Sequence, residues 1–122
     1  MGSLFLDSNF LFDITERDVK KREMLDGYKS FLSTLSYHIL FYTYKYKVPK
    51  KEIARHKKEF YLVDLTDKIL DQSLQGPTKD LEDNIQLHSA TEAGCDYFLT
   101  NDKRLLKMKF FGKTRIVDRL RN

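Results

Sequence analysis

The stretch LEDNIQLHSATEAGCDYFLTNDKRLL, from Leu81 to Leu106, decides the expected fold. Its first part predicts a helix that Asp80 opens and that runs to Gly94. The apolar run YFLT, residues 97–100, is typical of a buried strand, and a short helix follows it. A strand between two helices is the repeating unit of α/β proteins with parallel sheets.

The rest of the chain shows the same alternation of strands and helices. We expect further strands at residues 3–6, 28–33, 60–65 and 114–118, and further helices at residues 8–14, 16–25, 34–47, 50–60, 67–74 and 102–108. Nothing in the chain marks a repeat or a domain boundary. The pattern therefore indicates one α/β domain over residues 1–122 with a parallel sheet, and it gives no strand order.

The composition is typical of a globular domain. The chain has 122 residues, of which 41% are hydrophobic and 33% charged, as in a globular domain with one core. No apolar run reaches the roughly 18 residues that would span a membrane, and the start lacks the features of a signal peptide. Cys95 is the single cysteine, which excludes a disulfide within the chain. We expect a cytoplasmic protein without a membrane partner.

The charges are unevenly distributed along the chain. The net charge is +4, and residues 41–60 carry seven lysines and arginines against two glutamates. Residues 61–102 carry nine acids against Lys68 and Lys79. The first region suits phosphate groups, and the second suits cations.

Four aspartates are expected to meet at one edge of the sheet. Asp7 ends the first strand, Asp102 follows the fourth, and Asp80 and Asp83 begin the helix that leads back to the fourth. In a parallel α/β sheet these positions share the carboxyl edge, where ligands bind. Carboxylates in such proximity repel unless a cation neutralises them, and Mg²⁺ or Mn²⁺ suits a site of oxygen ligands.

Helix capping is the alternative explanation for each of these acids. Asp7 and Asp102 stand where they could cap the helices that follow them, and Asp80 with Asp83 has the spacing of a capping box. If capping is their only role, changing the aspartates costs about 0.5–2 kcal/mol of stability and removes no activity.

Two blocks of sequence resemble the PIN domain, the nuclease fold of VapC-type toxins. They are LFLDSNFLFD, residues 4–13, and DLEDNIQLHSATEAGCDYFLTND, residues 80–102. The resemblance covers essentially the whole chain, most loosely from Glu16 to Gly76. It implies a PIN-like three-layer α/β/α fold with a parallel five-stranded sheet in the order 3-2-1-4-5.

The resemblance also implies a function and roles for individual residues. It implies a Mg²⁺- or Mn²⁺-dependent ribonuclease that hydrolyses single-stranded or loop RNA, as the toxin of a toxin–antitoxin pair with an antitoxin partner, and a homodimer. By position, the catalytic and metal-binding residues are Asp7, Asp83 and Asp102, with Asp80 as a further candidate ligand. The supporting polar residues are Ser8, Asn9, Thr100 and Asn101.

The chain departs from the family pattern in the helix after the second strand. The family pattern there is Ser-x-x-Thr-x-x-Glu, whereas this chain reads STLSYHI, with Ser33 and Ser36 matching and Ile39 at the Glu position. The neighbouring His38 points about 100° away from residue 39 on a helix. The alternative function is therefore a catalytically weakened PIN fold that binds RNA or a protein.

Residues 42–51, YTYKYKVPKK, interleave tyrosines with lysines. Basic and aromatic side chains together suit single-stranded RNA, which makes Lys45, Lys47, Lys50 and Lys51 candidate RNA-binding residues. The alternative is a helix end whose tyrosines are buried under lysines that extend into water. Helical spacing puts Leu35, Ile39, Tyr42 and Tyr46 on one face of the helix at residues 34–47, which suits burial or packing on a partner. The family resemblance implies that the apolar face of residues 16–47 forms a dimer interface or accepts an antitoxin peptide.

Overall fold

One six-stranded sheet organises the chain, in the order β3-β2-β1-β4-β6-β5, in a computed structural model that describes residues 2–120. The strands are β1 Ser3–Leu6, β2 Lys29–Ser33, β3 Tyr61–Val63, β4 Tyr97–Leu99, β5 Phe110–Phe111 and β6 Thr114–Val117. All neighbouring strands are parallel except β5 and β6. The parallel part has the expected order, with β6 as the expected fifth strand.

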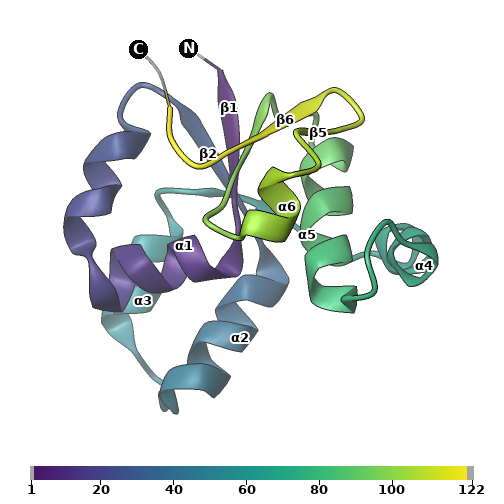
Figure 1. The fold of residues 1–122 in the computed structure, drawn as a ribbon. Helices are drawn as coiled ribbons and strands as arrows, with labels where there is room; N and C mark the ends of the chain where they lie inside the picture. The colour runs from purple at the N-terminus through teal and green to yellow at the C-terminus, as the bar shows by residue number, and fades with distance from the viewer. Residues whose placement is uncertain (1, 121–122) are drawn as a thin grey trace.

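The helices lie on both faces of the sheet, as Figure 1 shows. They are α1 Ser8–Phe12, α2 Thr34–Tyr44, α3 Lys51–Lys57, α4 Asp67–Gln75, α5 Leu81–Glu92 and α6 Lys103–Leu106, with a π-helical turn η1 at Asp13–Arg17 and a 3₁₀ helix η2 at Val19–Leu25. In Figure 1, α1, α2 and α3 lie on one side of the sheet, and α4 and α5 lie on the other.

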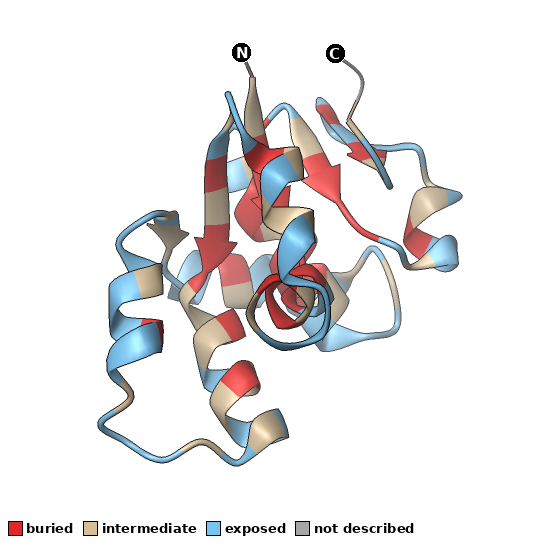
Figure 2. Cartoon of the chain, turned by 90° about the vertical axis from the view of Figure 1, so that its left-hand side faces the viewer, coloured by how far each residue is buried: buried red, intermediate tan, exposed pale blue. Residues whose placement is uncertain are grey.

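The core is divided between the two faces of the sheet because side chains alternate along each strand. Leu4 and Leu6 of β1 pack in a cluster with α1, α2 and α3, whereas Phe5 packs in a second cluster with α5 and α6. Figure 2 shows the buried residues concentrated in the central strands and on the inner sides of the helices. The expected three-layer α/β/α architecture is confirmed.

Strand β5 was not expected. It forms a hairpin with β6, in which Phe111 pairs with Thr114 across a two-residue turn that begins at Gly112. Gly112 has a positive φ of 61°, which glycine adopts without steric cost. A strand of only two residues leaves no apolar alternation for a sequence pattern to reveal.

The expected α-helix at residues 16–25 is wrong. The structure has the π-helical turn and the 3₁₀ helix instead, separated at Asp18, whose φ is −153°. Leu25 is the one residue of η2 that is buried, so packing supplies little energy to hold a regular α-helix there. Helix α2 is also shorter than expected, since it ends at Tyr44 and Lys45 adopts the left-handed conformation.

No helix among the described residues is both long enough and apolar enough to cross a membrane.

Candidate active site

Strands β1 and β4 bring Asp7 and Asp102 to the same edge of the sheet. The two strands pair in parallel, with Leu6 opposite Leu99, and the Asp7 amide donates to the Leu99 carbonyl at 3.3 Å. Helix α5 begins at this edge and supplies three further acids. We call Asp7, Asp80, Glu82, Asp83 and Asp102 the acidic edge.

Asp7 is held in a fixed position. Its side chain is buried and accepts hydrogen bonds at both oxygens, from the Phe10 amide at 2.8 Å and from the Thr100 hydroxyl at 2.6 Å. Burial raises the pKa of Asp7, an effect that the two hydrogen bonds reduce and that the charges of Asp13 and Asp102 increase. Each carboxylate oxygen can accept more than one hydrogen bond or ligand bond, so Asp7 retains lone pairs for a cation.

Thr100 connects Asp7 to Asp102. Its hydroxyl donates to Asp7 Oδ2 and accepts from the Asp102 amide at 3.0 Å, and its side chain is almost fully buried. A single hydroxyl thus fixes one carboxylate and the backbone of the other. This is a supporting role of the kind expected for Thr100.

Asp83 has the most perturbed carboxyl group of the acidic edge. Partial burial raises its pKa to about 6, and the charges of Asp80, Asp102 and Glu82 contribute in the same direction. The pKa of Glu82 is also raised, by burial and then by Asp80 and Asp7. The charge of Asp102 raises the pKa of both Asp7 and Asp83, which lie with it on the same edge of the sheet.

The acids face two neighbouring cavities. Asp7 and Asp102 line one of about 430 Å³, together with Asn9, Asp13, Arg17 and Asn101. Asp80 and Asp83 line another of about 310 Å³, together with Thr78, Lys79, Arg104 and Leu105. Within residues 2–120, no three His, Cys, Asp or Glu side chains are grouped closely enough to form a metal cage.

This arrangement fits an open magnesium or manganese site better than a closed one. Mg²⁺ commonly binds one or two carboxylates and keeps several water molecules, so it does not need a cage of three acids. The donors are oxygens, and burial together with neighbouring carboxylates raises the pKa values of Asp7 and Asp83, so a bound cation would favour their ionised forms. Asp7 and Asp102 would hold the ion in the larger cavity, with Asp83 on the adjoining side.

Three of the four expected acids do cap helices. Asp7 caps α1, Asp80 caps α5 by accepting from the Asp83 amide at 3.0 Å, and Asp102 caps α6 by accepting from the Arg104 amide at 2.8 Å. Capping therefore explains their positions in the chain. It does not explain Asp83, which caps no helix among the described residues, or the raised pKa values.

A buried polar network joins the elements behind the acids. The Ser8 and Ser36 hydroxyls are 2.9 Å apart, and the Gln86 amide nitrogen lies 3.2 Å from each of them. These three residues tie α1, α2 and α5 together. Gln86 was not predicted from the sequence motifs, although it lies three residues after Asp83 and hence on nearly the same side of α5.

The position of the missing glutamate lies next to this network. Ser33 caps α2 and Ser36 contacts Ser8, and Ile39 lies about one turn further along the same helix. Ile39 is partly buried and packs against the core cluster, while His38 is exposed. The apolar side chain at position 39 therefore serves packing.

Arg17 is a second residue that motif analysis missed. It lines the cavity of Asp7 and Asp102 and is fixed there by Asp13 Oδ1 at 2.8 Å and by the Asn9 carbonyl at 2.8 Å. The π-helical turn η1 produces this placement, and such turns are frequent at functional sites. No sequence pattern would have revealed a π-helical turn here.

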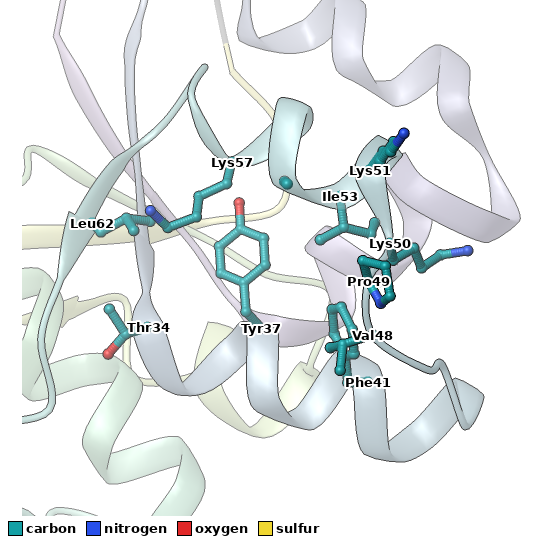
Figure 3. Close-up of a pocket in the computed structure, with 11 residues that line it drawn as sticks. Thr34, Tyr37, Phe41, Val48, Pro49, Lys50, Lys51, Ile53, Lys57 and Leu62 are labelled. Atoms are coloured by element: carbon teal, nitrogen blue, oxygen red, sulfur yellow. The ribbon is translucent and has the colours of Figure 1, made fainter.

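The candidate RNA-binding lysines lie away from both acidic cavities. Lys50 and Lys51 line a separate, largely apolar pocket of about 420 Å³ between α2 and α3, shown in Figure 3. Tyr44 stacks on Tyr46, and the Lys50 amine lies 4.2 Å from the Tyr46 ring. Lys45 and Lys47 are exposed, and so is Tyr42, although helical spacing had placed Tyr42 on the apolar face.

Two solved structures share this fold. A chain of a toxin–antitoxin complex from Klebsiella pneumoniae has a TM-score of 0.69 at 16% sequence identity, over 83% of this chain and 88% of that one. VapBC2 from Rickettsia felis, bound to a DNA fragment from their promoter, contains a chain with a TM-score of 0.63 at 11% identity, over 94% of this chain and 97% of that one. No family model and no curated protein matches the chain. These likenesses support the PIN-like fold expected from the sequence.

Proposed function

We propose that the protein is a metal-dependent endoribonuclease that hydrolyses single-stranded or loop RNA, and that it is the toxin of a toxin–antitoxin pair. The observation that carries this proposal is the link from Asp7 through the Thr100 hydroxyl to Asp102, at the mouth of a cavity. The structural likeness to chains of toxin–antitoxin complexes supports it. An antitoxin partner, a homodimer and a cytoplasmic location belong to the same proposal.

The residues at and behind the acidic edge have separate roles in phosphodiester hydrolysis. Asp7, Asp83 and Asp102 would hold one or two Mg²⁺ or Mn²⁺ ions, with Asp80 as a further candidate ligand. When bound, the metal lowers the pKa of a coordinated water and neutralises charge on the phosphate. Thr100 orients the Asp7 carboxylate through its 2.6 Å hydrogen bond. The hydrogen bond from Gln86 to Ser8 holds the start of α1 next to α5.

Arg17 supplies a positive charge inside the cavity of Asp7 and Asp102. Its Nε and one Nη are engaged by Asp13 and Asn9, which leaves its other donors available for a phosphate oxygen. Asn101 lines the same cavity and is exposed. Lys45 and Lys47, which are exposed at the end of α2, are proposed to contact the RNA chain further from the cleaved bond.

The test is a cleavage assay with labelled, mixed-sequence single-stranded RNA in Mn²⁺, in Mg²⁺ and in EDTA. We expect cleavage that requires metal and that disappears in the Asp7→Asn, Asp102→Asn double variant. Asp96→Asn is the matched control, since Asp96 is an exposed aspartate at the opposite end of β4 that contacts Ser3. Absence of cleavage together with undetectable metal binding by calorimetry would contradict the proposal and leave a binding module in which the acids are only helix caps.

A further inference from the structure

The β5–β6 hairpin, at one edge of the sheet in Figure 1, places a row of aromatic and basic side chains on one face of the sheet. Tyr97 of β4 is opposite Arg115 of β6, and Arg115 is opposite Phe110 of β5. Because directly paired residues point to the same face, these three side chains lie next to one another across three strands. Tyr28 extends the row, since its ring packs edge-on against that of Tyr97 with 6.5 Å between the ring centroids. We call Tyr28, Tyr97, Arg115 and Phe110 the aromatic row.

The aromatic row lines a cavity of about 400 Å³. The other residues of its lining are Gly2, Asp96 and Lys113, so no aliphatic side chain takes part among the described residues. The Arg115 guanidinium lies over the Phe110 ring, 5.2 Å from its centroid, and the Phe110 side chain is still 50% exposed. The Phe110 ring therefore has surface available for a flat ligand.

The charges around this cavity favour an anionic ligand. Lys113 and Arg115 are exposed and form no ion pair within residues 2–120. Asp96 is the one acid among the described lining residues, and its Oδ2 accepts from the Ser3 amide at 3.0 Å and from the Ser3 hydroxyl at 3.3 Å. Asp96 therefore holds the start of β1, whereas the two cations remain available for phosphate oxygens.

Aromatic rings next to unpaired cations suit a nucleotide better than a protein segment. Proteins bind single-stranded RNA with aromatic side chains on which bases stack and with cations that contact the backbone, and a sheet surface is a common place for both. An amphipathic protein helix instead lays its apolar face into a hydrophobic groove. Here three of the seven lining residues are charged, which leaves no continuous apolar surface for such a helix.

The aromatic row lies within reach of an RNA strand at the acidic edge. Tyr97 packs on the core cluster that contains the α1 residues, and α1 also contributes to the cavity of Asp7 and Asp102, so both places are on the same side of the sheet. Thr100 follows Tyr97 by three residues, which corresponds to about 10 Å of strand. A few nucleotides cover that distance even in a stacked strand.

We propose that the aromatic row is a second RNA-binding site, in which a base of single-stranded RNA stacks on Phe110 and the neighbouring phosphates pair with Lys113 and Arg115. Stacking accepts any base, so the row adds affinity for the strand without selecting a sequence. The inference rests on the proposed function in taking RNA as the ligand. Binding at the row requires neither metal nor cleavage.

The experiment measures binding of a labelled, mixed-sequence single-stranded RNA to the full chain by fluorescence anisotropy, in EDTA so that metal-dependent cleavage does not occur. We expect Phe110→Leu to weaken binding about fivefold or more, the loss that corresponds to one stacked base. Lys113→Gln, Arg115→Gln should also weaken binding, and the slope of log affinity against log salt should become shallower by about 1.4, which is about 0.7 for each of two phosphate contacts. Phe110→Leu should leave that slope unchanged, because it removes a ring and no charge.

Matched variants make the result specific to the aromatic row. Tyr61→Leu removes a ring that is 54% exposed at the other edge of the sheet, and it should leave the affinity unchanged. Lys20→Gln, Lys58→Gln removes two exposed lysines outside this cavity, and it should leave both the affinity and the salt slope unchanged. Circular dichroism checks the fold of each variant. Photo-crosslinking of RNA that carries 4-thiouridine needs no variant, and we expect the crosslinks in peptides that contain Tyr97 or Phe110.

Several outcomes would overturn the inference. They are an unchanged RNA affinity in Phe110→Leu, equal losses in the row variants and their controls, and crosslinks that avoid both peptides. Binding of AMP as tight as that of RNA would also overturn it, because the row would then serve a free nucleotide. Failure of the nuclease proposal leaves RNA binding in EDTA intact, and failure of the row leaves metal-dependent cleavage at Asp7 and Asp102 intact, so the two results are distinguishable.

Discussion

At the scale of single residues, the Thr100 hydroxyl stabilises the ionised carboxyl group of Asp7. Replacing Thr100 by valine keeps the shape but leaves the buried Asp7 Oδ2 without its hydroxyl donor. We expect the unfolding free energy to fall by about 1–3 kcal/mol and the pKa of Asp7 to rise further, because this hydrogen bond lowers that pKa in the folded chain. Chemical denaturation and carboxyl NMR titration measure the two effects.

Thr100→Ser is the matched control for this prediction. Serine retains the hydroxyl, so the pKa of Asp7 should stay close to that of the unchanged chain, with only a small loss of packing. An unchanged Asp7 pKa in Thr100→Val would show that the hydroxyl does not hold the carboxylate.

The carboxyl group of Asp83 makes the folded chain less stable as the pH rises, which is the reverse of the usual effect of an aspartate. Its folded-state pKa is raised from 3.8 to about 6, so the folded chain binds this proton more tightly than the unfolded chain. The resulting stability is fully present below pH 3.8 and is lost as the pH rises through about 6. We expect Asp83→Asn to remove this loss and to be relatively more stable than the unchanged chain at neutral pH.

Urea unfolding at several pH values tests whether the free energy of unfolding falls as the pH rises. The comparison with Asp83→Asn isolates this group, because Glu59, whose pKa Arg22 lowers, contributes in the opposite direction in both chains. A difference between the two chains that is independent of pH would contradict the prediction.

At the scale of elements, variants at the start of α5 can distinguish the helix-capping role of Asp80 from the effect of its charge. Asp80 Oδ1 accepts from the Asp83 amide, and Asp80 also raises the pKa of Asp83. Asp80→Asn keeps a good cap and removes the charge, so stability should hold and the pKa of Asp83 should fall. Asp80→Ala removes both and should cost about 0.5–2 kcal/mol. Equal effects of the two changes on stability would show that capping is not what Asp80 provides.

Elements with strong local signals could be predicted from the sequence, and elements without them could not. The apolar run of β1 and the Asp80 start of α5 were predicted because each depends on neighbouring residues. The π-helical turn and β5 were missed, because the first differs from an α-helix only in its backbone bond from Asp18 to Asp13 and the second depends on pairing with β6. The placement of Arg17 in the cavity was missed for the same reason.

The acidic edge was only partly predictable. Following strands and helix starts placed Asp7, Asp83 and Asp102 on one edge of the sheet, because the geometry of parallel sheets fixes that edge, but within residues 2–120 they are not grouped as one metal cage. Their division between two cavities, and the Gln86 contacts behind them, depend on side-chain packing that sequence spacing does not encode. The strand order came from the family resemblance and not from the residues themselves.

At the scale of the whole molecule, one sheet lies between both core clusters. β1 contributes Leu4 and Leu6 to one cluster and Phe5 to the other, so neither cluster can be lost without exposing the same strand. We expect a single cooperative unfolding transition, with coincident midpoints by circular dichroism and tyrosine fluorescence. Separate midpoints would show that the two helical layers unfold independently.

The central place of β1 has a consequence for how the chain is made. This strand leaves the ribosome well before β4, which is one of its two neighbours in the sheet and lies far along the chain. Until Tyr97–Leu99 emerges, one edge of β1 has no partner, and Asp7 has neither Thr100 nor Asp102 beside it. A growing chain therefore cannot assemble the acidic edge before β4 and Asp102 have emerged.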